Sequence, residues 1–234
     1  MTADRTTPAR PSPVAVSCRL SPEAAHRYNS LLAVILGYSS HLVQRPDCPA
    51  EFRSALHHIC EAAQKGRRLT ADLLTDSGAS APEAPGAARP PLEEATGALA
   101  KEAARPAPGI WVVDDDPIFS EMCLHVLAES GHKVQVVNSS AAVRAAWKEA
   151  KVQPDLMIVD FSMPEGSGLE LCRWLRQQGA NLPVILVSGF SAQQPAIRKA
   201  LELRRVYFLQ KPFPVPELED LVMVALGTQL LPNP

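Results

Sequence analysis

Four separate hydrophobic runs in the second half of the chain end in side chains that could together handle a phosphoryl group. They end in two adjacent acids, a third acid, a hydroxyl and an ammonium group: Asp114 and Asp115, Asp160, Ser188, and Lys211. Three carboxylates held close together repel one another, so they need a cation. An oxygen-only ligand set suits Mg²⁺, which keeps bound waters and accepts phosphoryl oxygens. A carboxylate nucleophile, a divalent metal, a lysine and a hydroxyl are together suited to phosphoryl transfer.

The spacing of these runs predicts the elements that would bring the side chains together. From residue 110 the chain alternates between short apolar runs, typical of buried parallel strands, and helical patterns. We expect strands at 110–113, 133–137, 155–159, 183–187 and 206–210, and helices at 117–130, 141–150, 169–178, 195–203 and 216–226. This alternation predicts an α/β fold with a five-stranded, doubly wound parallel sheet. The five side chains would then lie at its carboxyl edge, where such sheets bind ligands.

Two long helical patterns precede the sheet. Ser21 and Pro22 are placed to begin a helix that runs to about residue 44, and a second helix follows from about 50 to 76. A helical projection of residues 26–43 gathers large apolar side chains on one face: Tyr28, Leu31, Leu32, Ile35, Tyr38, Leu42 and Val43. The helices predict an antiparallel hairpin whose apolar stripes are covered by a second copy, in a dimeric four-helix bundle.

The opposite face of the first helix carries His26 among small residues: Ser30, Ala33, Gly37 and Ser40. A histidine that serves only the core would not lie there, so we expect His26 to be exposed. The small residues beside it would let another protein approach closely.

The chain therefore divides into a disordered tail (1–20), the hairpin (21–77), an Ala/Pro/Gly-rich linker (78–108), the α/β domain (109–228) and a tail (229–234). A net charge of −2 gives no electrostatic footprint for nucleic acid, and no apolar run approaches the length of a membrane span. The 5 cysteines include no Cys-x-x-Cys pair and are expected to be reduced thiols in a cytoplasmic protein.

Residues 109–228 resemble the receiver domain of two-component response regulators. The resemblance is carried by Val112-Val113-Asp114-Asp115-Asp116, Asp160 with Met163-Pro164 and Gly168, Ser188-Gly189, and Lys211-Pro212-Phe213. It implies a flavodoxin-like receiver fold. It also implies that Asp160 accepts a phosphoryl group from the phosphohistidine of a cognate histidine kinase or phosphotransfer protein.

The same resemblance assigns roles to the other site residues. It implies that Asp115 and Asp160 bind Mg²⁺ directly, that Asp114 acts through water, and that Ser162 offers its backbone carbonyl. Lys211 would contact the phosphoryl oxygens, with a cis Lys211-Pro212 bond. Ser188 and Phe208 take the positions of the family's switch residues, which move on phosphorylation. Departures from the family pattern at Pro195 and Arg204-Arg205 affect the expected output surface and not the chemistry.

Residues 25–38 resemble the dimerisation and phosphotransfer hairpin (DHp, HisKA-like) of histidine kinases, through the run Ala25-His26-Arg27-Tyr28-Asn29-Ser30-Leu31-Leu32 followed by Val34-Ile35-Leu36-Gly37-Tyr38. His26 falls on the phosphoacceptor histidine, and Ser30 on the position that orients water in phosphatase reactions. Arg27 replaces the acid that assists autophosphorylation, and an arginine cannot act as that base. Only the linker stands where a kinase has its ATP-binding domain, so we expect no ATP-dependent kinase activity.

Three functions stay open for the hairpin. His26 could be a second phosphoryl station that exchanges with Asp160 or with the aspartate of another receiver domain. The hairpin could instead be an aspartyl-phosphate phosphatase that acts through Ser30. It could also be a dimeric scaffold, with the receiver as a phosphate sink.

Overall fold

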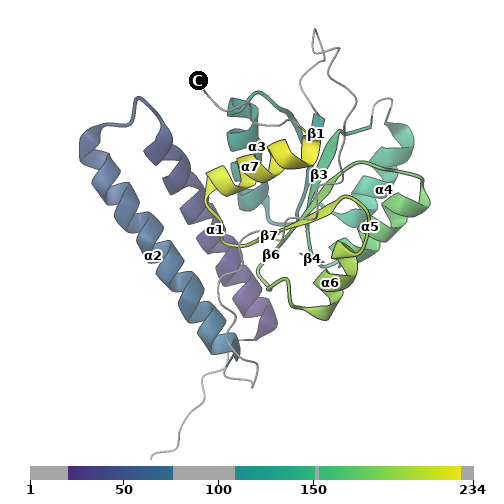
Figure 1. The fold of residues 1–234 in the computed structure, drawn as a ribbon, viewed down its shortest axis with the longest axis horizontal. Helices are drawn as coiled ribbons and strands as arrows, with labels where there is room; N and C mark the ends of the chain where they lie inside the picture. The colour runs from purple at the N-terminus through teal and green to yellow at the C-terminus, as the bar shows by residue number, and fades with distance from the viewer. Residues whose placement is uncertain (1–20, 76–108, 151–152, 228–234) are drawn as a thin grey trace, which may run out of the picture.

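The computed structural model describes residues 21–75, 109–150 and 153–227 (Figure 1). The expected tails (1–20 and 229–234) and the expected linker (78–108) lie outside these residues. Within the described ranges, no helix has an apolar stretch long enough to cross a membrane.

The two N-terminal helices form the expected hairpin. Helix α1 spans Pro22–Gln44 and begins where the sequence predicts, because the Ser21 side chain accepts a hydrogen bond from the Ala24 N–H. Helix α2 spans Ala50–Thr75. The helices pack closely at Gly66, where an added Cβ would lie 3.1 Å from a methyl carbon of Leu32.

The second half of the chain forms a parallel sheet in the order β2-β1-β3-β6-β7, which confirms the expected flavodoxin-like sheet. Its strands are β1 (Gly109–Val113), β2 (Lys133–Val137), β3 (Leu156–Asp160), β6 (Val184–Ser188) and β7 (Val206–Gln210). Every residue of β3 and of β6 is buried, as expected for strands covered on both faces.

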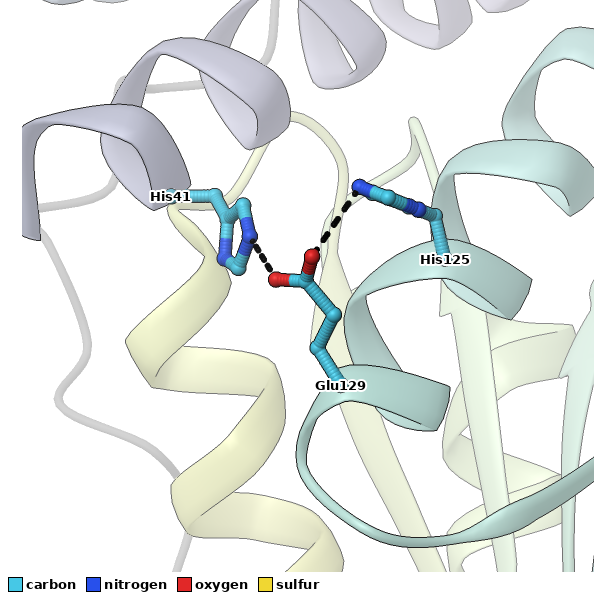
Figure 2. Close-up of side chains that lie close together, drawn as sticks. All are labelled: His41, His125 and Glu129. Carbon is cyan, nitrogen blue, oxygen red and sulfur yellow. Dashed lines mark hydrogen bonds and ion pairs between the residues drawn. The ribbon is translucent and has the colours of Figure 1, made fainter. Parts of the chain in front are cut away.

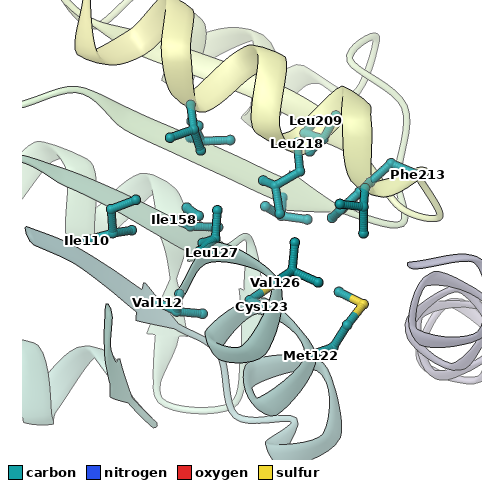
Figure 3. Packing of buried hydrophobic residues seen from close by; sticks show 14 of the residues in the cluster. Ile110, Val112, Met122, Cys123, Val126, Leu127, Ile158, Leu209, Phe213 and Leu218 are labelled. Atoms are coloured by element: carbon teal, nitrogen blue, oxygen red, sulfur yellow. The ribbon is translucent and has the colours of Figure 1, made fainter. Parts of the chain in front are cut away.

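Helices cover both faces of the sheet (Figure 1). One face carries α3 (Pro117–Glu129) and α7 (Val215–Leu226), and the other carries α4 (Ser140–Glu149), α5 (Gly168–Gln177) and α6 (Pro195–Leu201). Alternate strand residues therefore enter two separate cores. The core under α3 and α7 includes Ile110, Val112, Ile158, Leu209 and Phe213 (Figure 3).

One small element was not predicted. Between the expected strand at 155–159 and the expected helix at 169–178, β4 (Ser162–Met163) and β5 (Gly166–Ser167) pair as a two-residue antiparallel ladder. Gly166 has a φ of +130°, a conformation that favours glycine. The Ser167 side chain then caps α5, and Glu170 completes a capping box.

The hairpin packs against the α/β half of the same chain. Helix α1 contacts α3 and α7, and Ala33 on α1 is part of the core beneath them. Gly37 faces Met122 of α3 so closely that a Cβ there would clash with the Met122 sulfur. The Ser40 hydroxyl accepts a hydrogen bond of 2.9 Å from the backbone N–H of Val215, the first residue of α7.

The face of α1 predicted to receive another protein is thus covered by the chain's own receiver. The expectation that His26 is exposed was therefore wrong, because only 20% of its side chain is accessible. Most of the large apolar residues of the opposite face do lie exposed in the single chain: Tyr28, Leu31, Ile35 and Leu42.

Candidate functional site

Three of the predicted site residues meet at the carboxyl edge of the sheet. The ammonium group of Lys211 donates hydrogen bonds to Asp114 Oδ2 at 2.8 Å and to Asp160 Oδ1 at 2.9 Å. All three side chains are buried, and Lys211 is fully enclosed. Two carboxylates therefore share one lysine in a site almost without solvent.

The sheet brings these groups together because β1, β3, β6 and β7 run parallel and end at one edge. Lys211 follows β7, and its backbone N–H donates to the Ser188 carbonyl at 2.7 Å. The peptide bond to Pro212 is cis, as the resemblance implies. The lysine nitrogen also lies 3.7 Å from the centre of the Phe119 ring, whose face attracts a cation.

Buried acidic groups outnumber buried basic groups at this edge of the sheet. Burial and the nearby Asp160 carboxylate raise the pKa of Asp114 to about 6, although Lys211 acts in the opposite direction. Burial alone would lower the pKa of Lys211, but the attraction of Asp160 and Asp114 outweighs it and raises this pKa to about 12. Two buried carboxylates against one ammonium group leave a negative site.

The other predicted metal ligands, Asp115 and Ser162, lie just after β1 and just after β3, at the same edge. Asp115 is exposed. Asp160 Oδ2 accepts a hydrogen bond of 2.7 Å from the backbone N–H of Ser162, and Asp114 Oδ1 accepts one of 2.8 Å from Asp116. The donor set is all oxygen and carries excess negative charge. These residues therefore fit a hard divalent cation such as Mg²⁺.

The two predicted switch residues lie on neighbouring strands. The Ser188 hydroxyl is buried and accepts a hydrogen bond of 3.1 Å from the Phe190 N–H. Phe208 is half-buried and packs against the core under α4, α5 and α6. Rotation of Phe208 toward Ser188 stays a prediction.

His26 lies over the acidic edge. Its Nε2 atom is 4.0 Å from Asp160 Oδ2, so the docked hairpin brings the two predicted phosphoryl carriers of one chain face to face. Whether a receiver exchanges phosphate with its own hairpin or with that of a second copy stays open.

Asn29 and Gly189 fasten this arrangement, and neither was singled out as a contact residue. The Asn29 side-chain amide donates to the Gly189 carbonyl at 3.1 Å. A Cβ on Gly189 would lie 2.9 Å from the Asn29 nitrogen, so glycine permits the close approach. The available signals were the small-residue face around Asn29 and the Ser188-Gly189 motif, but neither pattern alone indicates that the two segments touch.

Polar atoms without partners gather beside His26. Among the described residues, His26 Nδ1, Asn29 Oδ1 and Ser30 Oγ are buried and have no hydrogen-bond partner. Buried polar groups are usually paired, often through ordered water. Three such atoms within one helical turn indicate that water or a ligand group belongs at this contact.

Comparison with known proteins agrees with the receiver half. Residues 110–223 match the family described as "Response regulator receiver domain". The alkaline phosphatase synthesis transcriptional regulatory protein SphR of Synechococcus elongatus is 30% identical over 137 residues, which cover 55% of this chain and 53% of SphR. The C4-dicarboxylate transport transcriptional regulatory protein DctD of Pseudomonas aeruginosa is 34% identical over 122 residues, which cover 52% of this chain and 26% of DctD. The chain thus spans about half, or less, of these relatives.

Two solved structures are also similar to part of this chain. The receiver domain of a signal transduction histidine kinase from Syntrophus aciditrophicus is 31% identical, with a TM-score of 0.46, and covers 54% of this chain and 96% of that one. The response regulator TrrA of Thermotoga maritima, solved in complex with Mg²⁺-BeF, is 25% identical, with a TM-score of 0.45, and covers 50% of this chain and 98% of that one.

Residues 110–223 are therefore a response regulator receiver domain, a module of two-component phosphorelay signalling. Receiver domains interact with histidine kinases or phosphotransfer proteins. SphR and DctD are described as transcriptional regulators, so the expectation that this chain binds no nucleic acid stays a prediction.

Proposed function

We propose that this chain is a phosphorelay protein that carries two phosphoryl stations, Asp160 on the receiver and His26 on the docked hairpin. The proposal depends on the 4.0 Å separation between His26 Nε2 and Asp160 Oδ2. A phosphorus atom bonded to one of these atoms at about 1.6 Å and approached by the other at about 3 Å spans a similar distance. A small adjustment of the hairpin would therefore accommodate in-line transfer.

In this proposal Asp160 is loaded from the phosphohistidine of a cognate histidine kinase or phosphotransfer protein. An Asp160 oxygen attacks phosphorus, the phosphorus–nitrogen bond breaks, and the electron pair returns to the imidazole nitrogen. The reverse step, with His26 as the attacking nitrogen, moves the group onto the hairpin. Lys211 neutralises charge on the phosphoryl oxygens, and the Ser188 hydroxyl donates to one of them.

Mg²⁺ fits the same proposal through this chain's own oxygens. Asp115 and Asp160 would hold it directly, Asp114 through water, and Ser162 through its backbone carbonyl. When bound, the ion supplies the positive charge that the two buried carboxylates and the phosphoryl group require.

The hairpin has a second part in the proposal, as a dimerisation element. Its exposed apolar residues include Ile35 on α1 and Phe52, Ile59 and Leu69 on α2. Isolated exposed apolar residues are common, but several on two paired helices favour association. We therefore propose that residues 21–77 form the interface of a homodimer and that residues 109–228 form the receiver.

A phosphatase function is the second candidate, because of the unpartnered atoms beside His26. Ser30 Oγ is buried without a hydrogen-bond partner, one turn of α1 after His26. A water held there would lie near the Asp160 phosphoryl group and could hydrolyse it. Relay and phosphatase activities predict different fates for the same phosphoryl group.

One labelling experiment tests both candidates. The full chain is loaded with radiolabelled acetyl phosphate and Mg²⁺, the donor is removed, and the label is followed by its chemistry. An aspartyl phosphate is labile to alkali, whereas a phosphohistidine survives alkali and is lost in acid. Variants His26→Gln and Ser30→Ala are compared with His58→Gln, which changes an exposed histidine on α2.

Relay predicts alkali-stable label in the wild type and in His58→Gln, and none in His26→Gln. Phosphatase activity predicts release of free phosphate that slows in Ser30→Ala. If label leaves Asp160 at the same rate in every variant and never reaches His26, both proposals fail and the hairpin is a scaffold. Mixing His26→Gln with Asp160→Asn separates transfer within a chain from transfer between chains, because only the latter restores labelled histidine.

A further inference from the structure

A second group of metal-ligating side chains lies where the hairpin meets the receiver, away from the phosphoacceptor site. His41 comes from α1, and His125 and Glu129 come from α3 (Figure 2). Their ligand atoms all lie within 4.8 Å of one another. Among the described residues, this is the one group of three or more His, Cys, Asp and Glu side chains to do so. None of the three belongs to the receiver motifs.

The geometry of this group converges on one carboxylate. His41 Nε2 lies 2.7 Å from Glu129 Oε2, and His125 Nε2 lies 3.5 Å from Glu129 Oε1. The two imidazole rings meet edge to face, with centroids 6.0 Å apart. Figure 2 shows both rings directing a nitrogen toward the Glu129 carboxylate. Ligand atoms of a tetrahedral zinc site lie about 3.3 Å apart, so small side-chain rotations would suffice.

We propose that His41, His125 and Glu129 form a binding site for a divalent transition metal, best matched by Zn²⁺, that joins the hairpin to the receiver. Two imidazoles and one carboxylate are a donor set that Zn²⁺ accepts with a water in its fourth position. Mg²⁺ prefers an all-oxygen ligand set, so it would bind at the Asp160 site while Zn²⁺ binds at the site of His41, His125 and Glu129. Partial exposure of His125 and Glu129 leaves the water position open.

Arg45 is the one cation that competes for this carboxylate among the contacts described. Its guanidinium lies 3.2 Å from Glu129 Oε1, and it also holds Asp47 through hydrogen bonds of 2.9 and 3.1 Å. Oε2 of Glu129 is free of Arg45 and faces His41. Arg45 therefore orients the carboxylate and leaves one oxygen for the metal.

The surroundings give the metal a path to the site. One of the three side chains, His125, lines a hollow together with Tyr38, Glu121, Leu124 and Ala128. The Glu121 carboxylate, one turn before His125 on α3, adds negative charge near that hollow and attracts cations.

The site exists only while the hairpin is docked, because α1 supplies one ligand and α3 the other two. A metal that binds the docked form and not the separated form stabilises docking by mass action. Zn²⁺ would thus hold α1 against α3. The binding claim does not depend on the proposed phosphorelay, and it can fail or succeed independently of it.

The test is titration of the metal-stripped full chain with Zn²⁺ against a chromophoric chelator. We expect one equivalent to bind the wild type, and His41→Gln and His125→Gln to bind at least about tenfold more weakly. Glutamine keeps a hydrogen-bond donor for Glu129, and His125 is half exposed, so folding is not at risk. His58→Gln, also an exposed histidine, serves as the matched control and should bind as the wild type does.

Amide hydrogen exchange supplies the second readout. Zn²⁺ should slow exchange in the last turns of α1 in the wild type and in His58→Gln, and not in His125→Gln. Unchanged affinity in both interface variants would overturn the site. Site-dependent binding without protection of α1 would overturn its bridging role.

Discussion

The receiver's sheet edge and the hairpin surface docked on it contribute to the His26–Asp160 contact by opposite means. At the sheet edge, buried charges are paired and held by strand ends, with Lys211 bonded to both Asp114 and Asp160. On the hairpin, small residues allow close approach while buried polar atoms of His26 and Asn29 have no partners among the described residues. The first region is held by paired charges, and the second by close packing and a few hydrogen bonds.

The largest expected effect tests the sheet edge at its nucleophile. Asp160→Asn should abolish labelling by acetyl phosphate, because an amide cannot form the acyl phosphate. Asp220→Asn, an exposed change on α7, should label normally. Equal labelling of both variants would refute the assignment of Asp160.

A substitution of Lys211 tests whether the buried carboxylates at this edge depend on the lysine charge. Lys211→Met leaves two carboxylates buried without their cation and should cost about 3–5 kcal/mol in the free energy of unfolding. Added Mg²⁺ should restore part of that loss, since it replaces the missing charge. Urea unfolding with and without Mg²⁺ measures both effects.

The control for that measurement is Lys133→Met, which changes an exposed residue of β2 and should shift stability by less than about 0.5 kcal/mol. A Lys211→Met chain as stable as this control would show that the sheet edge tolerates unpaired charge. The contrast with the hairpin surface would then disappear.

The contact between α1 and α3 should be broken by a single substitution that adds a side chain at Gly37. Gly37→Leu improves helix propensity in α1 but drives a side chain into Met122, so the hairpin should separate while the receiver stays folded. Amide exchange in α3 should rise, and acetyl phosphate should label Asp160 faster because the site is uncovered. Ser54→Leu, on the exposed face of α2, should do neither. Unchanged exchange and labelling in Gly37→Leu would mean that docking does not depend on close approach at Gly37.

The outer face of the hairpin tests dimerisation separately from docking. Ile35 is 46% exposed in the single chain, so Ile35→Glu should convert a dimer to a monomer by light scattering without altering Asp160 labelling. Val224→Glu, equally apolar and exposed on the receiver, should leave the dimer intact. A wild-type monomer would refute this part of the proposal.

The smallest effect concerns thiol reactivity. Burial raises the pKa of the Cys123 thiol well above its usual range and that of Cys172 to about 12, so both should resist alkylation in the native chain. Among the four cysteines that the structure describes, Cys48 and Cys60, half-buried on the hairpin, should react first. Peptide mapping after brief alkylation checks the order, and early modification of Cys123 would indicate a loose receiver core.

Much of the receiver could be predicted because its chemistry is tied to strand ends. Once five parallel strands are recognised, the fold itself brings Asp160 and Lys211 together, whatever the details of packing. The helix cap at Ser21 was also predicted correctly, because its side chain accepts a hydrogen bond from the Ala24 N–H of α1. The β4–β5 ladder was missed because two paired residues leave no periodic pattern.

The docked hairpin could not be predicted in the same way. Helical projection correctly separated the small face of α1 from its apolar face, but it assigned the small face to a different protein. Contacts such as Asn29 with Gly189, or His41 with Glu129, join residues with no local pattern in common. The docked position of the hairpin depends on shape complementarity and on single hydrogen bonds. Neither can be predicted from the periodicity of the sequence.

The hydrogen bond from Val215 to Ser40 makes the first turn of a receiver helix depend on another domain. The residue before α7 is Pro214, whose side chain offers no acceptor, so the hydroxyl of Ser40 acts as a borrowed N-cap. A receiver expressed without the hairpin would lose about 1 kcal/mol from that helix and fray at its start. Separation of the hairpin would thus directly destabilise the first turn of α7, which follows Lys211 closely in the chain. No intervening residues are needed to transmit the change.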